Sequence, residues 1–554
     1  MAWTALIGAG LHAWLRLRID ELNDSQRWAL GAGRIQRRQL RWLLTRAADT
    51  EFGRSHGFAR IAALDDPDLL RAYRQAVPIT DIEAYRAMLA RMRDEAEPNV
   101  LWPGVVWNWA QTSGTTAGDK FIPVSDEMLA HNRKAGLDIF AHYARRGCSL
   151  SELFGGKLLF LGGSTALETN DRGVRTGDLS GVVTPMIKWP ISAAHLPGRE
   201  IALMSDWPAK IDAMARVCLR ADVRFISGMP SWASVLFERL LEMANEAGAD
   251  ATSVRDLWPR LRLFVHGGVK YAPFEPRVRA LWSGDPGGDD IPERLEVYPA
   301  SEGFIATQDT PGDPGLRLNI DHRIFYEFVP LEEIDSPEPS AFACDEVERG
   351  QRYVVVMSTC AGLWRYIIGD VVEFDTIPPN GPPRLRIVGR HRHFINAFGE
   401  NIIVEHIENA VVEAARAVGV SIGEFTAAPV YPEGARRAGL ELAVEWSPEN
   451  PQQLAEFRDT FDRSIKSQNV DYTTKRTDDL GMAPPTITPL PAGALHRWMQ
   501  SVGKLGGQHK APRCANHRDI IEGVRTVAGV RGDIECKAQP EAGTTAAPAA
   551  GESL

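Results

Sequence analysis

The chain has 554 residues, too many for one hydrophobic core, so we expect two or more domains. Apolar residues make up 44% and charged residues 24% of the chain, which is typical of a globular protein and excludes a disordered or fibrous one. The formal net charge of −10 excludes the overall basic footprint of a nucleic-acid-binding protein.

The cysteines and the apolar runs indicate the cellular compartment in which the protein is expected. The six cysteines are scattered without a C-x-x-C pair, which argues against a zinc site or a disulfide framework and predicts a reducing, cytoplasmic location. No apolar run reaches the roughly 18 residues of a membrane span, so none is expected. Arg16 and Arg18 follow the apolar N-terminal stretch instead of preceding it, so we predict no secretory signal.

Residues 1–100 are predicted to be helical. Apolar residues near the N-terminus, from Trp3 to Leu15, recur at helical spacing and favour a first helix docked on the body of the protein. Contact of the same stripe with a membrane surface is the alternative. Segments 36–48 and 82–95 have the spacing of further helices, the second capped by Thr80 or Asp81.

The stretch 110–123 contains a loop rich in hydroxyls and glycines that ends in a lysine. Residues 112–120 hold four hydroxyl side chains, two glycines and Lys120. Such a loop can direct N–H groups and hydroxyls at one anion, and the lysine adds a full positive charge. The loop lacks the Gly-Lys-Ser/Thr ending of a Walker motif. A phosphate-binding loop is therefore predicted, with a polar surface loop as the alternative.

From about residue 100 to 390 we expect strands, glycine turns and helices to alternate. Apolar runs at 157–163 and 261–268 end in two glycines. A further run at 224–230 is followed by a helix expected at 232–244, and 352–359 resembles a buried strand. This order predicts an α/β domain with ligands at the strand ends. His266 stands at one such end, where a histidine could be a ligand or base but is more often satisfied by its neighbours.

The pattern of predicted elements changes after Arg390. A helix at 404–418, a strand at 440–446 and a helix at 451–466 predict a smaller α+β domain. The tail from residue 537 to 554 is rich in Ala, Pro, Gly, Thr and Glu, so we expect it to be disordered. No internal repeat is visible.

Six short segments carry candidate chemistry, although most are weak signals individually. They are 112–120, 298–302 (Tyr-Pro-Ala-Ser-Glu, a possible strand end with a carboxylate), 362–370 (ending in a predicted Gly-Asp turn), 389–390, 394–402 and 506–513.

In this order the segments resemble the adenylate-forming enzymes, and more closely the bacterial branch of the Gretchen Hagen family of acyl-acid amido synthetases. The similarity runs from about Gln36 to Val524. Further matching segments are 50–58, 227–232, 266–269, 469–472 and 503–508. One departure is Ile367, which stands where the plant members have an arginine before Gly369 and Asp370.

The resemblance implies a two-step ligase reaction. A carboxylic acid attacks the α-phosphorus of ATP to give an acyl-adenylate and pyrophosphate, and an amine, usually an amino acid, then displaces AMP. It implies Lys510, Glu302 and Lys120 as catalytic residues, with Glu302 also holding Mg²⁺. The residues implied in binding nucleotide or acyl group are Thr112, Ser113, Gly114, Thr115, Thr116, Gly118, Gly267, Gly268, Tyr298, Ala300, Ser301, Asp370 and Arg390.

The implied architecture is a large N-terminal adenylation domain with mixed sheets and helices (1–392), a smaller mobile α+β domain (393–525) and a disordered tail (526–554). Lys510 would enter the site when the smaller domain closes, with a surface lysine as the alternative.

Two alternative functions are open: transfer of the acyl group to a thiol such as coenzyme A, and a catalytically inactive binding protein. The expected partners are a small carboxylic acid and an amine; neither is identified, and a monomer is compatible with the sequence.

Overall fold

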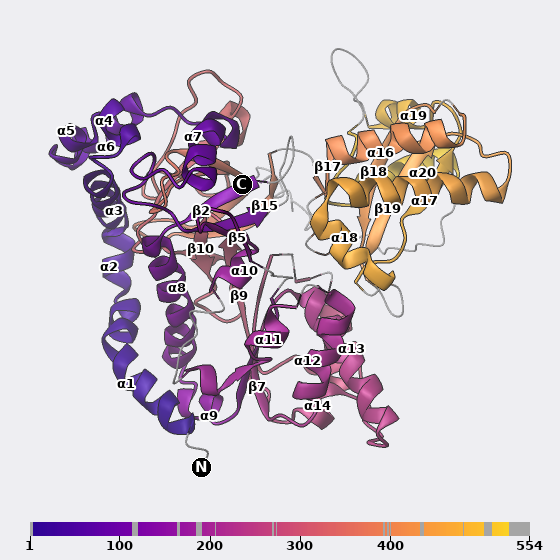
Figure 1. Ribbon diagram of the computed structural model, residues 1–554, viewed down its shortest axis with the longest axis horizontal. Coiled ribbons are helices and arrows are strands. Elements are labelled where there is room, and N and C mark those ends of the chain that lie inside the picture. Colours follow the sequence, from indigo (N-terminus) through magenta and orange to yellow (C-terminus); the bar gives the residue numbers. More distant parts are fainter. Residues whose placement is uncertain are drawn as a thin grey trace, which may run out of the picture.

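The computed structural model describes residues 4–112, 120–162, 167–183, 191–204, 206–268, 271–272, 274–391, 394–395, 398, 400, 402–420, 422–432, 437–479, 481–502 and 512–530. Within these ranges the protein is a mixed α/β structure with a large N-terminal domain and a smaller C-terminal domain, as predicted. Figure 1 shows the smaller domain, in orange and yellow, beside the part of the large domain that carries α11–α14.

The N-terminal region is helical, as the spacing predicted. Its helices are α1 (Thr4–Asn23), α2 (Ser25–Leu30), α3 (Ala32–Arg46), α4 (Glu51–Ser55), α5 (Phe58–Ala62), α6 (Asp66–Ala76) and α7 (Ile82–Asp94). Asp81 is the cap of α7, because its carboxylate accepts the Glu83 N–H. Helix α1 docks on the body as expected: Leu15 and Leu22 are buried, and Gly8 packs against the backbone of Leu150.

The same helix also presents apolar side chains outward. Leu6, Trp14 and Leu17 are 66–80% exposed. None of the described helices is both long enough and apolar enough to cross a bilayer.

A small sheet carries the hydroxyl-rich loop. Its strand order is β2-β1-β5-β4, in which β1 pairs antiparallel with β2 and parallel with β5. The strands are β1 (Asn108–Thr112), β2 (Lys120–Val124), β4 (Glu168–Thr169) and β5 (Arg175–Gly177). The loop therefore joins the two strands of a hairpin.

A large sheet forms the centre of the molecule, in the order β12-β13-β14-β15-β11-β10-β9-β8-β7-β3-β6. Its parallel part contains β3 (Lys157–Phe160), β6 (His195–Leu196), β7 (Val223–Ser227), β8 (Leu263–Gly267) and β9 (Glu293–Ala300). Its antiparallel part continues with β10 (Gly303–Thr307), β11 (Leu316–Leu318), β12 (Phe325–Pro330), β13 (Arg352–Ser358), β14 (Tyr366–Thr376) and β15 (Arg384–Arg390).

The expectation of alternating strands and helices up to residue 390 is wrong beyond α15. Residues 284–390, all described, contain strands and one short 3-10 helix, η3 (Leu331–Glu333), and no α-helix. Here neighbouring strands pair antiparallel, so they need no helical crossover to return the chain. The sheet changes from parallel to antiparallel at β9, and Glu302 lies in the turn that follows.

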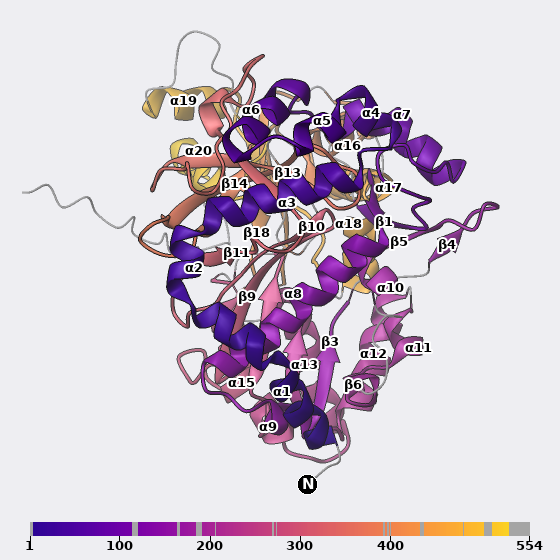
Figure 2. The same ribbon diagram turned by 90° about the vertical axis from the view of Figure 1, so that its left-hand side faces the viewer.

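Helices cover both faces of the large sheet. Figure 2 shows α1, α3 and α8 crossing one face. The helices after the first strands are α8 (Asp126–Arg145), α9 (Leu150–Phe154), α10 (Leu179–Val183), α11 (Arg199–Ala202), α12 (Trp207–Cys218), α13 (Pro230–Glu246), α14 (Val254–Leu257) and α15 (Glu275–Ser283), with the 3-10 helix η2 (Ile191–Ala193). Runs such as Leu158-Leu159 are buried on both faces, as in parallel sheets.

The smaller domain has the predicted α+β composition. After the short pair β16 (Phe394–Ile395) and β17 (Ile402–Ile403), its sheet has the order β18-β19-β20. Its elements are α16 (Val404–Ala417), β18 (Phe425–Val430), β19 (Gly439–Glu445), α17 (Pro451–Gln468), α18 (Val470–Arg476), η4 (Thr477–Asp479), β20 (Thr486–Leu490), α19 (Ala494–Ser501) and α20 (Asp519–Ala528). One hydrophobic cluster joins this domain to the α12–α15 side of the large domain.

Candidate active site

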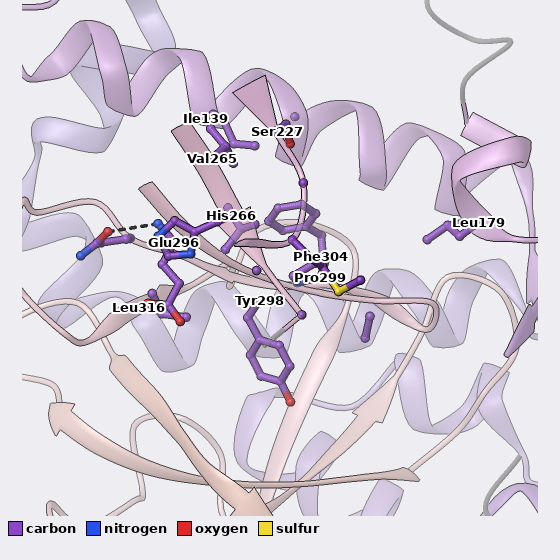
Figure 3. Close-up of a pocket in the computed structure, with 18 of the residues that line it drawn as sticks. Ile139, Leu179, Ser227, Val265, His266, Glu296, Tyr298, Pro299, Phe304 and Leu316 are labelled. Atoms are coloured by element: carbon purple, nitrogen blue, oxygen red, sulfur yellow. Dashed lines mark hydrogen bonds between the residues drawn. The ribbon is translucent and has the colours of Figure 1, made fainter. Parts of the chain in front are cut away.

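One large cavity brings most of the described candidate residues together. It has a volume of about 2360 Å³ and is lined by Lys120, Tyr298, Glu302 and Asp370. Gly267, Gly268, Ala300 and Ser301 line it too. Figure 3 shows part of the cavity, with Tyr298 on one side and apolar residues such as Ile139 and Val265 on another.

The hairpin β1–β2 delivers Lys120 to this cavity. Thr112, the last residue of β1, pairs with Lys120, the first residue of β2, so the two strands hold both ends of the predicted phosphate loop together. Of the loop candidates, Ser113, Gly114, Thr115, Thr116 and Gly118 lie outside the described residues. The hairpin geometry agrees with a tight loop whose lysine is fixed at its C-terminal end.

Glu302 and Lys120 form a buried ion pair. The Lys120 Nζ contacts Glu302 Oε1, and the hydroxyl of Tyr366 donates to the same oxygen at 3.3 Å. Lys120 Nζ also lies 4.8 Å from the centre of the Tyr366 ring. Since the Glu302 and Lys120 side chains are only 6% and 12% exposed, both charges are held where water screens them little.

His131, on α8, anchors the turn that carries Glu302. Its Nε2 accepts the N–H of Phe304 at 2.7 Å, and its Nδ1 lies 2.6 Å from the carbonyl oxygen of His322. Because Nε2 accepts, the ring proton must be on Nδ1, where it donates to His322. Burial lowers the pKa of His131 to about 3, so the ring is neutral at neutral pH.

The contacts around His131 continue to the N-terminal helix α1. His322 Nε2 lies 2.9 Å from Asp138 Oδ2, and Arg18 on α1 donates to the same carboxylate at 2.6 Å. The sequence analysis missed this chain of contacts. Each link joins residues more than a hundred positions apart, and no local pattern marks a histidine that holds a backbone N–H.

Asp370 lies within a strand, so the predicted Gly-Asp turn is wrong. Asp370 is in β14 opposite Arg390 of β15, and its carboxylate accepts a hydrogen bond from the Tyr298 hydroxyl. Gly369 has φ +98°, and the pairing of β14 with β13 is irregular there. A glycine with positive φ inside a strand marks a bulge, which re-aims the neighbouring side chain. The Arg390 side chain is not among the described ones.

Gly267, the last residue of β8, and Gly268, which follows it, lie against neighbouring backbone and side chains. A Cβ on Gly267 would collide with the carbonyl oxygen of Val297, and Gly268 has φ +82°. Next to them, His266 is buried and stacks on Tyr271 with ring centres 4.5 Å apart. Burial lowers its pKa to about 3. Contrary to the expectation of a locally satisfied histidine, neither ring nitrogen has a hydrogen-bond partner among the described residues.

The far end of the cavity is apolar. Phe160 and Phe225 have ring centres 5.2 Å apart, and Phe140 lies 5.8 Å from Phe225. Ile139 and Val265 also line this part (Figure 3). Such a surface fits the carbon skeleton of an organic acid.

The smaller domain also reaches the cavity, through Ile403, Val404, Glu408, Tyr431 and Asn516. The sequence analysis did not predict these residues. Lys510, its candidate from this domain, lies outside the described residues.

Glu302 suits the magnesium role that the sequence implied. The described residues contain no group of three or more His, Cys, Asp or Glu side chains placed to hold a metal ion. Mg²⁺ bound with a nucleotide needs only one or two carboxylates, with phosphate oxygens and water as its other ligands. Glu302 is buried and contacts Lys120, which lies at the end of the hairpin that carries the predicted phosphate loop. Glu302 therefore meets that requirement.

Models of three domains of one protein family match the chain in order. The GH3 family N-terminal domain matches residues 22–190 and 169–287, the central domain matches 318–390 and the C-terminal domain matches 405–519. The chain is 22% identical over 577 aligned residues to the jasmonoyl–L-amino acid synthetase JAR6 of Nicotiana attenuata, covering 90% of this chain and 93% of that protein.

A second Nicotiana attenuata relative, the jasmonoyl–L-amino acid synthetase JAR4, is 28% identical over 193 residues, which is 34% of this chain and 31% of JAR4. The chain thus spans less than a third of this relative. Among solved structures, the acyl acid amido synthetase AtGH3.15 in complex with 2,4-DB shares the fold, with a TM-score of 0.56 and 19% identity over 94% of this chain and 96% of that one. From the three matched domains in order, the chain belongs to the GH3 family.

Proposed function

We propose that the protein is an ATP-dependent acyl-acid amido synthetase, which adenylates a carboxylic acid and transfers the acyl group to the amine of an amino acid. The observation that carries the proposal is the convergence of Lys120, Glu302, Tyr298 and Asp370 on one cavity with an apolar extension. The names of the relatives support it, because they are amido synthetases.

The first half-reaction requires a carboxylate to attack a polyanion. Lys120 would neutralise charge on the phosphates, and the backbone of the loop it closes would hold them. Glu302 would hold Mg²⁺, which when bound supplies further charge neutralisation. Asp370 would accept hydrogen bonds from the ribose hydroxyls, and Tyr298 would hold Asp370 in place and lie against the adenine.

The remaining assignments extend this proposal. Gly267, Gly268, Ala300 and Ser301 would line the nucleotide and acyl positions, and Arg390 would reach ribose or phosphate. The domains would meet near residue 392, with Lys510 carried by a mobile smaller domain. We also place the chain in a bacterial branch of the family and in the cytoplasm.

The test is a pyrophosphate-release screen with ATP, Mg²⁺ and pooled carboxylic acids, followed by product analysis after addition of pooled amino acids or coenzyme A. Pyrophosphate release with an amide as the product supports the proposal. A thioester product in place of the amide supports the thiol alternative. No release with any acid, while ATP still binds, supports an inactive binding protein.

A further inference from the structure

The cavity extends to the boundary between the two domains, where Asp178 lines it. Asp178 follows β5 directly, and Gly177 at the end of β5 pairs with Ala110 of β1. Asp178 is thus beside Gln111 and Thr112, two strands from Lys120, or about 10 Å between backbones at the usual strand spacing. It lines the same cavity as Lys120, and Figure 3 shows the next residue, Leu179, at the edge of that cavity.

Among the described residues, none places a cation at ion-pair distance from the Asp178 carboxylate. That carboxylate accepts the N–H of Ser180 at 2.7 Å. The described carboxylates Glu302 and Glu408, which also line the cavity, both have such a cation, Lys120 and Arg513. Burial raises the pKa of Asp178. A carboxylate held in a cavity without a counter-ion suits a cationic ligand.

The smaller domain already places a primary ammonium in this neighbourhood. Lys475 on α18 has its Nζ 5.6 Å from the centre of the Trp232 ring and 3.5 Å from Asp471 Oδ1. Its side chain is 6% exposed, and its charge lowers the pKa of Asp178. Trp232 lines the cavity and packs on Trp207 at 5.1 Å. The other charged groups near Asp178 are Asp471 on α18 and the buried Lys210 on α12.

We propose that Asp178 and the face of Trp232 bind the ammonium group of the acceptor amine, and that Lys475 takes the place of that ammonium in the domain arrangement seen here. This inference rests on the proposed function. An aromatic face and a carboxylate are together a suitable receptor for an alkylammonium ion. The position beside the phosphate loop puts the amine within reach of the acyl-adenylate.

Asp178 then acts as the base for the second half-reaction. An ammonium ion has no lone pair, so it must first lose a proton, which passes to the Asp178 carboxylate. The amine nitrogen attacks the acyl carbon, the C–N bond forms, and the bond from that carbon to the phosphate oxygen breaks with its electron pair leaving on AMP. The second N–H proton is lost to water, and Asp178 releases its own proton to water afterwards.

The experiment separates the two half-reactions in Asp178→Asn. The acid that gives the most pyrophosphate in the screen is adenylated first, and the adenylate is then chased with a mixture of the common amino acids or with hydroxylamine. Hydroxylamine is largely unprotonated at neutral pH, so it needs neither an ammonium site nor a base. We expect pyrophosphate release and hydroxamate formation within a few-fold of the parent, and amide formation reduced by roughly 10²-fold.

Glu408→Gln is the matched control, because Glu408 is another cavity-lining carboxylate but has a cation partner; it should leave both products unchanged. Amide formation near the parental rate in Asp178→Asn, or equal losses with both nucleophiles, overturns the proposal. A parent that releases no pyrophosphate would instead count against the proposed function.

Lys475→Met tests the same site without altering Asp178. Removal of the competing ammonium should lower the KM for the amine several-fold and leave the KM for ATP unchanged. An unchanged or raised KM for the amine overturns the proposal that Lys475 occupies the position of the substrate ammonium.

Discussion

The two ends of the cavity are built in different ways. At the nucleotide end Lys120 is paired with Glu302, and Asp370 accepts a hydrogen bond from the Tyr298 hydroxyl. These residues stand on or directly beside strands of the two sheets. At the other end the wall is made of aromatic and aliphatic side chains from helix α8 and from strands β3, β7 and β8.

This difference separates two tasks. Paired charges on strands are fixed before the substrate arrives, so they can stabilise developing charge with little reorganisation. An apolar wall selects its ligand by shape, and a change of one side chain there alters preference at a modest cost in free energy. The residues at the nucleotide end therefore indicate the type of reaction, whereas the identity of the acid depends on the shape of the other end.

The largest effect is expected from Glu302→Gln. Loss of one charge that acts mainly in the transition state typically costs about 3–4 kcal/mol, so pyrophosphate release should fall roughly 10²–10³-fold with the fold retained. Glu296→Gln is the control, because Glu296 lines the same cavity on the same β9–β10 hairpin without contacting Lys120. A Glu302→Gln enzyme within a few-fold of the parent would remove Glu302 from the reaction.

The next prediction tests whether the activity at the nucleotide end depends on the hydrogen bond from the Phe304 N–H to His131. His131→Asn cannot reach Phe304 with an acceptor and should lower the turnover number about tenfold or more while the KM for the acid stays constant. His131→Gln can place an amide oxygen near the position of Nε2, so it should recover most of that loss.

His142→Asn serves as the control for burial. His142 lies on the same helix and is equally buried, but its ring faces Arg145 and not the Glu302 turn. Equal turnover in the Asn and Gln variants of His131 would show that the hydrogen bond to Phe304 is unimportant for Glu302.

The same contrast explains what the sequence could and could not predict. Lys120 and Glu302 could be proposed from the sequence because a hydroxyl-rich loop and a strand end are local patterns, and the structure brings the two side chains together at one cavity. Asp370 was identified but placed in a turn, because a Gly-Asp pair in a strand bulge has the composition of a turn. His131, Tyr366 and Asp178 were missed, since their roles depend on packing between segments that are distant in sequence.

Asp370→Asn should have an intermediate effect, confined to the nucleotide. The amide keeps one acceptor but loses the charge, so the KM for ATP should rise about tenfold while the melting temperature changes little. Asp375→Asn, on the same strand and paired with Arg386 away from Tyr298, is the control and should leave the KM for ATP unchanged. A large fall in stability with an unchanged KM would make Asp370 a structural residue.

The smallest effect is expected at the apolar end, from Phe160→Leu. Phe160 lines the cavity and its ring contacts those of Phe225 and His195. A smaller side chain should change the relative kcat/KM among acids of different bulk by a few-fold, in favour of the larger ones, because a few methylene-sized contacts in an apolar pocket discriminate only weakly. The KM for ATP should not change, since Phe160 is remote from the paired charges of the nucleotide end. Phe154→Leu is the matched control: Phe154 is fully buried against Phe140 and does not line the cavity, so it should cost about 1 kcal/mol of stability and leave the preference as it was. If Phe160→Leu alters ATP use as much as acid preference, the two ends are coupled and the separation of chemistry from specificity fails.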